Sequence, residues 1–172
     1  MPNDILVVRE NIAAKLWHIR GKKVLLDYDL AVLYGVPTKA LKQAARRNLN
    51  RFPIDFMFQL SQKETDYLRS QIVTLKRGQH IKYKPYAFTE LGVAMLSSVL
   101  HSERAIKVNI EIMRTFAEIR EFLSTHKDLA EKLEELEQKY DGQFRVVFDA
   151  IKNMLQTRKK SKSIIGFRPN TQ

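Results

Sequence analysis

Apolar and polar residues in the first fifty positions follow a strand period and then a helix period. Residues 16–26 contain two short apolar runs around Gly21, a pattern typical of a β-hairpin. From Asp27 the apolar spacing becomes helical, and Gly35 is well placed to end this helix in a left-handed conformation. The Val-Pro pair that follows cannot continue the helix, and Thr38 is a good N-cap for another. The pattern predicts a hairpin, then helix, tight glycine turn and helix.

The second predicted helix, from about Lys39 to Asn50, separates into two faces on a helical wheel. One sector contains the apolar residues Leu41, Ala44, Ala45, Leu49 and Phe52. The opposite sector contains Lys39, Gln43, Arg46, Arg47 and Asn50, with Lys42 on its flank. These polar residue types contact base edges and phosphates in DNA complexes. A solvated surface helix is the alternative, but such helices usually mix acids and bases, and no acid occurs from Thr38 through Pro53, which favours a recognition helix.

Two further strands and a helix are predicted between residues 56 and 88. In the first strand, Phe56, Phe58 and Leu60 alternate with Met57, Gln59 and Ser61, which is the period-two pattern of a half-buried strand. Ser61 and Glu64 form a capping box for a helix reaching about Ile72. Residues 86–88 read as a second strand, and the two strands could pair as a small sheet beside the helix pair.

A basic loop connects this helix to the strand at 86–88. Its cations are Lys76, Arg77, Lys82 and Lys84. At the edge of a small sheet, such a loop would resemble the wing of a winged helix and deliver these cations to a phosphate backbone. A mobile surface loop without a binding role is the alternative.

Two helices follow, and the second is a core helix. Thr89 caps a helix from Glu90 to about Leu100, and Ser102 caps a longer one through about Ser124. Apolar residues cover more than half the circumference of the longer helix. Asn109 lies within its apolar sector, so its amide needs hydrogen bonds, to a neighbouring backbone or to a symmetry mate. We expect the bond to form within one chain.

The C-terminal region has the spacing of a coiled coil. From 126 to 158 the seam consists of Leu129, Leu133, Leu136, Tyr140, Phe144, Val147, Ile151 and Met154, with one stutter near Gly142. This predicts a dimerisation helix, and the alternative is a helix that folds back antiparallel within one chain. Residues 159–172 form a basic tail that could act as a phosphate-binding arm.

Charge is unevenly distributed along the chain, which has 172 residues and a formal net charge of +11. Residues 1–101 carry 16 basic and 8 acidic side chains, whereas residues 102–157 carry 9 and 11. A basic front joined to a nearly neutral helical rear suggests a nucleic-acid reader with a separate assembly element. With 44% hydrophobic and 28% charged residues, the composition is that of a globular protein.

Several classes of chemistry lack the residues they need. The chain has no cysteine, so disulfides, thiolate metal sites and cysteine nucleophiles are excluded. The four histidines have no metal-ligand spacing, and no cofactor is expected. No apolar run is long enough to cross a bilayer and the start does not resemble a signal peptide, so we expect a cytoplasmic protein without a membrane partner.

One pair of carboxylates leaves an enzymatic alternative open. Asp27 and Asp29 follow a predicted strand and could hold Mg²⁺, as in a nuclease. Alternatively, both act at the N-terminus of the short helix, where negative charge is favoured. We prefer the second interpretation and expect no enzyme.

Several runs of residues resemble a known family. They are residues 19–27, 29–36, 46–48, 51–60, 86–100, 102–105, 108–110 and 112–114. In this order they are similar to the KilA-N superfamily of phage and bacterial DNA-binding domains, in the branch named Orf-six-N. The resemblance implies DNA binding, often in phage antirepressors that carry a separate C-terminal domain. Here only a helical coil and a basic tail follow, so a bacterial or prophage regulator is the more natural expectation.

Together these patterns predict an α+β, mostly helical fold with a helix-turn-helix-like core and a small antiparallel sheet. Residues 1–125 would form the DNA-binding domain, 126–158 the coiled coil and 159–172 the tail. We expect Arg46, Arg47, Gln43 and Asn50 to read base edges of double-stranded DNA, and Lys39, Lys42, Arg51 and the loop cations to hold phosphates. A homodimer would read two half-sites in transcriptional or prophage regulation. The competing hypothesis is an antirepressor whose coil captures a protein partner.

Overall fold

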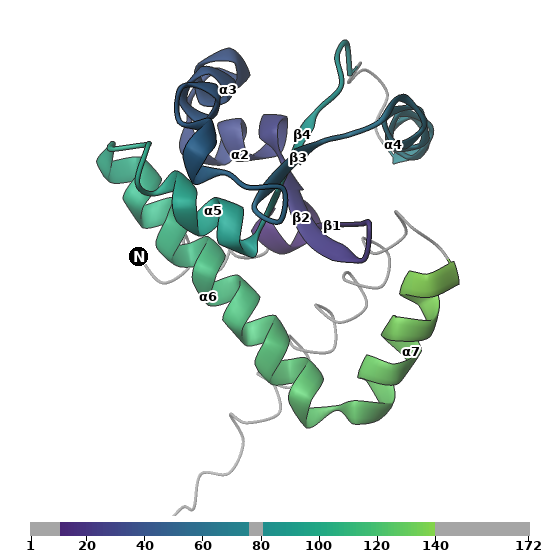
Figure 1. Cartoon of the computed structure of the whole chain (residues 1–172). Helices are drawn as coiled ribbons and strands as arrows, with labels where there is room; N and C mark the ends of the chain where they lie inside the picture. The colour runs from purple at the N-terminus through teal and green to yellow at the C-terminus, as the bar shows by residue number, and fades with distance from the viewer. Residues whose placement is uncertain (1–10, 76–80, 140–172) are drawn as a thin grey trace, which may run out of the picture.

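The computed structural model describes residues 11–75 and 81–139, which form an α+β fold that is mostly helical (Figure 1). In chain order the elements are β1 Trp17–Ile19, β2 Lys22–Leu26, α2 Asp27–Tyr34, α3 Thr38–Arg47, the 3-10 turn η1 Leu49–Arg51, β3 Met57–Gln59, α4 Gln62–Leu75, β4 Tyr86–Thr89, α5 Glu90–Leu96, α6 Glu103–Thr125 and α7 Lys127–Lys139. The predicted fold class is confirmed.

The four strands form one antiparallel sheet in the order β1-β2-β4-β3. The predicted hairpin is confirmed: Ile19 pairs with Lys22, and the two residues between them, Arg20 and Gly21, have φ values of 53° and 71°. Positive φ at both turn residues matches the right-handed twist of the strands. β4 pairs with β2 as well as β3, so the hairpin and the later strands form a single sheet.

Both faces of the sheet are buried, each in its own hydrophobic cluster. Leu25, Met57 and Phe88 pack with α2, α3, α5 and α6, whereas Leu26, Phe58 and other side chains of the opposite face pack with α4. Figure 1 shows α4 on one side of the sheet and α2, α3, α5 and α6 on the other. The alternation of residues 56–61 predicted a half-buried strand, with only one buried face. This was wrong, because helices cover both faces and Met57 is 6% exposed.

The turn between α2 and α3 has the predicted glycine terminator. Gly35 has φ 69°, its N–H donates to the carbonyl of Val32, and the N–H of Val36 donates to the carbonyl of Ala31. This is the hydrogen-bond pattern of a Schellman motif. The predicted N-cap at Thr38 is wrong by one position: Pro37 is the N-cap and makes no side-chain cap bond, while Thr38 is the first helical residue.

α3 is shorter than the helix that the wheel assumed. It ends at Arg47, and Asn48 has φ −125° and ψ 37°, outside the helical region. The Asn48 side chain donates to the carbonyl of Ala44, which it reaches across the last turn. The chain then enters η1 out of phase with α3, so Leu49 is 57% exposed instead of joining the predicted apolar sector.

The other predicted helix starts are confirmed by their hydrogen bonds. In the capping box of α4, Glu64 N donates to Ser61 Oγ at 3.2 Å and Ser61 N donates to Glu64 Oε2 at 2.7 Å. Glu64 also accepts from Arg20, and this hydrogen bond lowers its pKa. Thr89 Oγ1 accepts from Gly92 N at the start of α5, and Ser102 Oγ accepts from Ala105 N at the start of α6. α4 ends at Leu75, beyond its predicted end near Ile72. α5 ends at Leu96, before its own predicted end near Leu100.

α6 is the central helix of the larger cluster. Its side chains Ile112, Phe116 and Ile119 are all buried in that cluster, where α6 packs on α2 and α5. Asn109 is also buried and accepts a hydrogen bond from the hydroxyl of Tyr34 in α2. The expectation of an intramolecular partner for Asn109 is confirmed, although this partner is a side chain instead of the backbone.

The chain bends between α6 and α7. His126 ends α6 with φ −125°, and the half-buried side chain of Leu129 in α7 packs against the larger cluster. A helix at 127–139 agrees with the start of the predicted coil. Residues 140–158 of that coil and the tail at 159–172 lie outside the described residues, so the seam from Tyr140 onward and the predicted domain boundaries stay predictions.

Candidate nucleic-acid interface

α3 has one buried side and one exposed side. Leu41 and Ala45 are 0% and 1% exposed, and they anchor the helix against the larger cluster. The outward residues Lys39, Gln43, Arg46 and Arg47 are all exposed. The fold therefore leaves open the acid-free face that the wheel identified, and no described part of the chain covers it.

η1 extends this exposed face beyond the end of α3. Asn50 and Arg51 are both exposed. Arg51 Nη1 donates to Ser98 Oγ at 3.1 Å, which links η1 to the segment that follows α5. Because Asn50 lies in η1, its position relative to Arg46 and Arg47 differs from that on a continuous helix.

The basic face of α3 is one basic patch, and the loop cations just before β4 form a second. Lys82 and Lys84 are exposed, whereas Lys76 and Arg77 lie outside the described residues. The backbone of this segment is held by Gln59, whose Nε2 donates to the carbonyl of Lys84 at 3.3 Å. The N–H of Leu60 donates to the carbonyl of Pro85 at 2.9 Å. Lys84 and Pro85 thus stay bonded to the β3 side of the sheet just before β4 begins.

The two basic patches meet at Lys42. Lys42 Nζ lies 3.8 Å from the ring centroid of Tyr83 and 5.4 Å from that of Tyr86, so the α3 lysine covers two rings of the β4 side. Burial raises the pKa of Tyr83, as does the charge of Asp27, while a hydrogen bond with Thr38 opposes the shift. The sequence reasoning missed Tyr83; its signal was an aromatic residue between two lysines.

The turn that sets the angle of α3 is braced by α6. Arg104 Nε donates to the carbonyl of Leu33 at 3.3 Å. A Cβ at Gly35 would lie 2.8 Å from the same Nε, so the Arg104 side chain packs directly over the glycine. The orientation of α3 therefore depends on a contact with α6 as well as on the local turn.

With this geometry in place, the comparisons identify the domain. The family model described as the ORF6N domain matches residues 14–99. The chain belongs to the ORF6N domain family. ORF6N is a phage-type domain of the KilA-N DNA-binding superfamily, which confirms the resemblance found in the sequence. No curated protein and no solved structure matches the chain.

The matched range of the ORF6N domain spans the whole sheet and α2 to α5. The resembling runs at 102–114 lie beyond the match, in α6. No helix in the described part of the chain is long and apolar enough to cross a membrane.

Asp27 and Asp29, the two carboxylates that could have held Mg²⁺ in a nuclease, both form hydrogen bonds within the ORF6N domain. Asp27 is 0% exposed; its Oδ1 accepts from Tyr28 N at 2.8 Å and its Oδ2 from Tyr86 N at 3.1 Å. Burial raises the pKa of Asp27. Asp29 accepts from Lys15 Nζ at 2.9 Å. These contacts at the start of α2 favour the helix-terminal interpretation over the metal-binding one.

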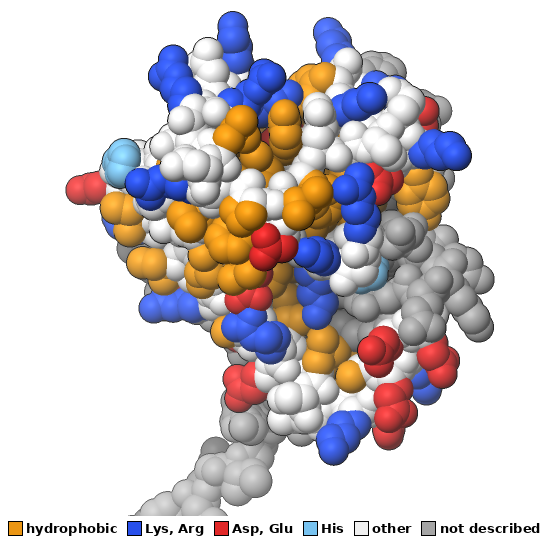
Figure 2. Space-filling model, in the orientation of Figure 1, with side chains coloured by type: hydrophobic (Ala, Val, Ile, Leu, Met, Phe, Trp, Pro, Cys, Tyr) orange, Lys and Arg blue, Asp and Glu red, His pale blue; other side chains and the backbone are white. Residues whose placement is uncertain are grey.

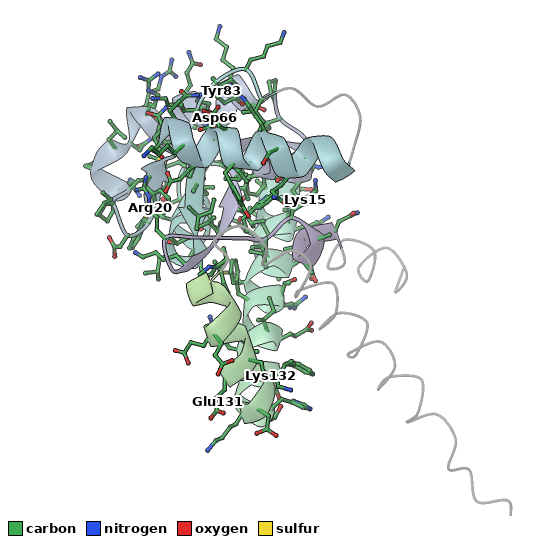
Figure 3. All side chains as sticks on the ribbon, turned by 90° about the vertical axis from the view of Figure 1, so that its right-hand side faces the viewer. Lys15, Arg20, Asp66, Tyr83, Glu131 and Lys132 are labelled. Atoms are coloured by element: carbon green, nitrogen blue, oxygen red, sulfur yellow. The ribbon has the colours of Figure 1, made fainter. Side chains whose placement is uncertain are left out.

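Charge is polarised between the two ends of the described structure. In Figure 2, Lys and Arg side chains gather over α3 and the tip preceding β4, whereas several Asp and Glu side chains gather over α7. Figure 3 shows Tyr83 at the end opposite Glu131 and Lys132 of α7. An anionic partner would be attracted to the α3 end of the ORF6N domain.

Proposed function

We propose that this ORF6N protein binds double-stranded DNA as a transcriptional or prophage regulator, with α3 as the helix that enters the major groove. The observation that carries the proposal is the exposed, acid-free outer face of α3 above its buried Leu41 and Ala45. The three exposed cations Lys39, Arg46 and Arg47 form no ion pair with a described side chain, so their positive charge is available to a partner. Family membership supports the same partner.

Base-edge reading is assigned to exposed polar residues of α3 and η1. Arg46 and Arg47 have the bidentate donors that match guanine, and Gln43 and Asn50 have the donor and acceptor pair that matches adenine. Phosphate contacts are assigned to cations around this face, namely Lys39, Arg51, Lys82 and Lys84, with Lys76 and Arg77 as further candidates.

Two copies of the chain would read a pseudo-palindrome, with half-sites about one helical turn or a multiple apart. The seam that begins in α7 supports pairing by its spacing. Leu129 packs on its own chain, so pairing depends on later seam residues. Sedimentation equilibrium of the full chain should give a dimer. A monomer at concentrations that saturate the DNA site would contradict this part of the proposal.

The proposal is tested by selecting bound duplexes from a random pool with the full chain and then measuring affinity for the enriched site. We expect one enriched motif and an affinity that falls steeply with salt. Arg46→Ala should weaken binding to the enriched site by about 1–3 kcal/mol and relax specificity at one position. Arg114→Ala, at an exposed position of α6, is the matched control and should change little. Unchanged affinity for both Arg46→Ala and Arg47→Ala would contradict the placement of α3.

A further inference from the structure

Lys42 differs from the other lysines of the basic surface. It is half-buried, whereas Lys39, Lys82 and Lys84 are exposed. Its ammonium group lies 3.8 Å from the ring centroid of Tyr83, close enough for a strong attraction to the electron-rich ring face. A phosphate contact would require Lys42 to share its charge with the ring or to leave it.

Several contacts hold the partner ring of Lys42 in place. Tyr83 has a hydrogen bond with Thr38, in the first turn of α3. The side chain of Gln59 donates to the carbonyl of Lys84, the residue after Tyr83. Tyr86 N donates to the buried carboxylate of Asp27. Asp27 also interacts electrostatically with Lys42. Lys42 is therefore the α3 side chain at the centre of a cluster that joins α2, α3 and the segment before β4.

We propose that Lys42 is a positioning residue, which holds Tyr83 and its flanking lysines next to α3 so that both basic patches act as one DNA-binding surface. Lys42 itself does not contact phosphate. Tyr83 is 39% exposed between Lys82 and Lys84, so the exposed part of its side chain belongs to that surface. This inference rests on the proposed DNA binding, but its first consequence concerns the protein without DNA.

The contact is tested in the free full-length protein by NMR and amide hydrogen exchange. In the wild type, the ring current of Tyr83 should shift the side-chain protons of Lys42 upfield. Lys42→Ala should speed amide exchange at Leu60 and Tyr86, whose N–H groups donate to the carbonyl of Pro85 and to Asp27 Oδ2, by about three- to thirtyfold, the range expected for loss of a cation–π contact. Lys42→Arg should keep most of the protection, and Lys39→Ala, which removes an exposed lysine of the same helix, should keep all of it. Equal protection in Lys42→Ala would overturn the proposal.

The effect on DNA is tested with a mutant cycle on the enriched site. Each phosphate contact contributes about 0.9 to the slope of log affinity against log salt. Lys42→Ala should lower the slope by about 1.8 in the wild type, through Lys82 and Lys84, and should have no added effect when both are already alanine. A loss of about 0.9 in both backgrounds would show a direct phosphate contact and overturn the proposal.

The two experiments separate this inference from the proposed function. If the wild type binds no duplex, the proposed function fails, while the exchange experiment still decides whether Lys42 holds Tyr83. If Arg46→Ala weakens binding but Lys42→Ala acts additively with the two loop lysines, DNA binding stands and the positioning role fails.

Discussion

α3 and α6 differ in how many side chains they bury and in how their charges are balanced. Over ten residues α3 buries two side chains and carries four basic residues without an acid. Over 23 residues α6 buries seven side chains, and its four acids and four bases allow pairs such as Arg114 with Glu111 at 2.7 Å. Mixed charge on α6 can be neutralised within the helix, but the charge on α3 cannot. The comparison indicates that α6 stabilises the fold and that α3 is available for a partner.

The largest expected effect comes from removing a core side chain of α6. Phe116 is 3% exposed within the larger cluster. Phe116→Ala should lower the free energy of unfolding by about 3–5 kcal/mol, because it removes buried apolar contacts and leaves a cavity. Urea denaturation followed by circular dichroism measures the change. A loss below about 1 kcal/mol would show that α6 is not the central packing element.

A smaller effect is expected at the turn that α6 braces. Gly35 and Gly21 have nearly equal φ values of 69° and 71°. A Cβ added at Gly35 would lie within 4 Å of the Arg104 side chain, whereas a Cβ added at Gly21 would have no atom within 4 Å. Gly21→Ala should cost about 1–2 kcal/mol for the left-handed backbone alone. Gly35→Ala should cost more, because Arg104 must also move.

The turn experiment has an internal control. Adding Arg104→Ala to Gly35→Ala should remove the excess cost over Gly21→Ala, apart from the loss of the Arg104 hydrogen bond with Leu33. Equal costs for the two glycine variants, measured by thermal unfolding, would contradict steric bracing of the turn.

A pH-dependent effect is expected at Asp27. Burial raises its pKa in the folded protein above the ordinary value of about 3.9. The contribution of protonated Asp27 to the free energy of unfolding is therefore fully present below its pKa in the unfolded chain. It is lost as the pH rises through its pKa in the folded protein. The stability of the wild type relative to Asp27→Asn should fall over that window. Urea titrations of both proteins across the acidic range measure it, and a difference that grows with pH would contradict the raised pKa.

The smallest effect on stability is expected on the outer face of α3. Arg47 is exposed and no described side chain forms an ion pair with it. Arg47→Ala should change the free energy of unfolding by no more than about 0.5 kcal/mol. The same variant should weaken binding to the selected duplex. A clear loss of stability without a loss of affinity would reverse the roles given to α3 and α6.

Local signals made much of this architecture predictable. The Ser61–Glu64 capping box, the Thr89 and Ser102 caps and the Gly35 terminator act within a few residues, and each forms as expected. The exposure of Arg46 and Arg47 also follows from helical periodicity. Their contact with DNA stays a prediction.

Features that depend on distant segments were not predictable. The wheel assumed a continuous helix to Asn50, but Asn48 interrupts it, so Leu49 is turned toward solvent. The burial of Met57 depends on which helices cover the sheet. The Lys42–Tyr83 contact joins residues 41 positions apart in sequence, and periodicity carries no information about such a pair.

The ORF6N match stops at residue 99, but the folding unit does not. α6 supplies Phe116 and Ile119 to the cluster beneath the sheet, and its Asn109 is the hydrogen-bond partner of Tyr34. A fragment cut at the family boundary would open that cluster to water and strip the Arg104 support from the helix turn. The shortest fragment of this protein that folds on its own should therefore extend through Thr125, beyond the residues that the family model matches.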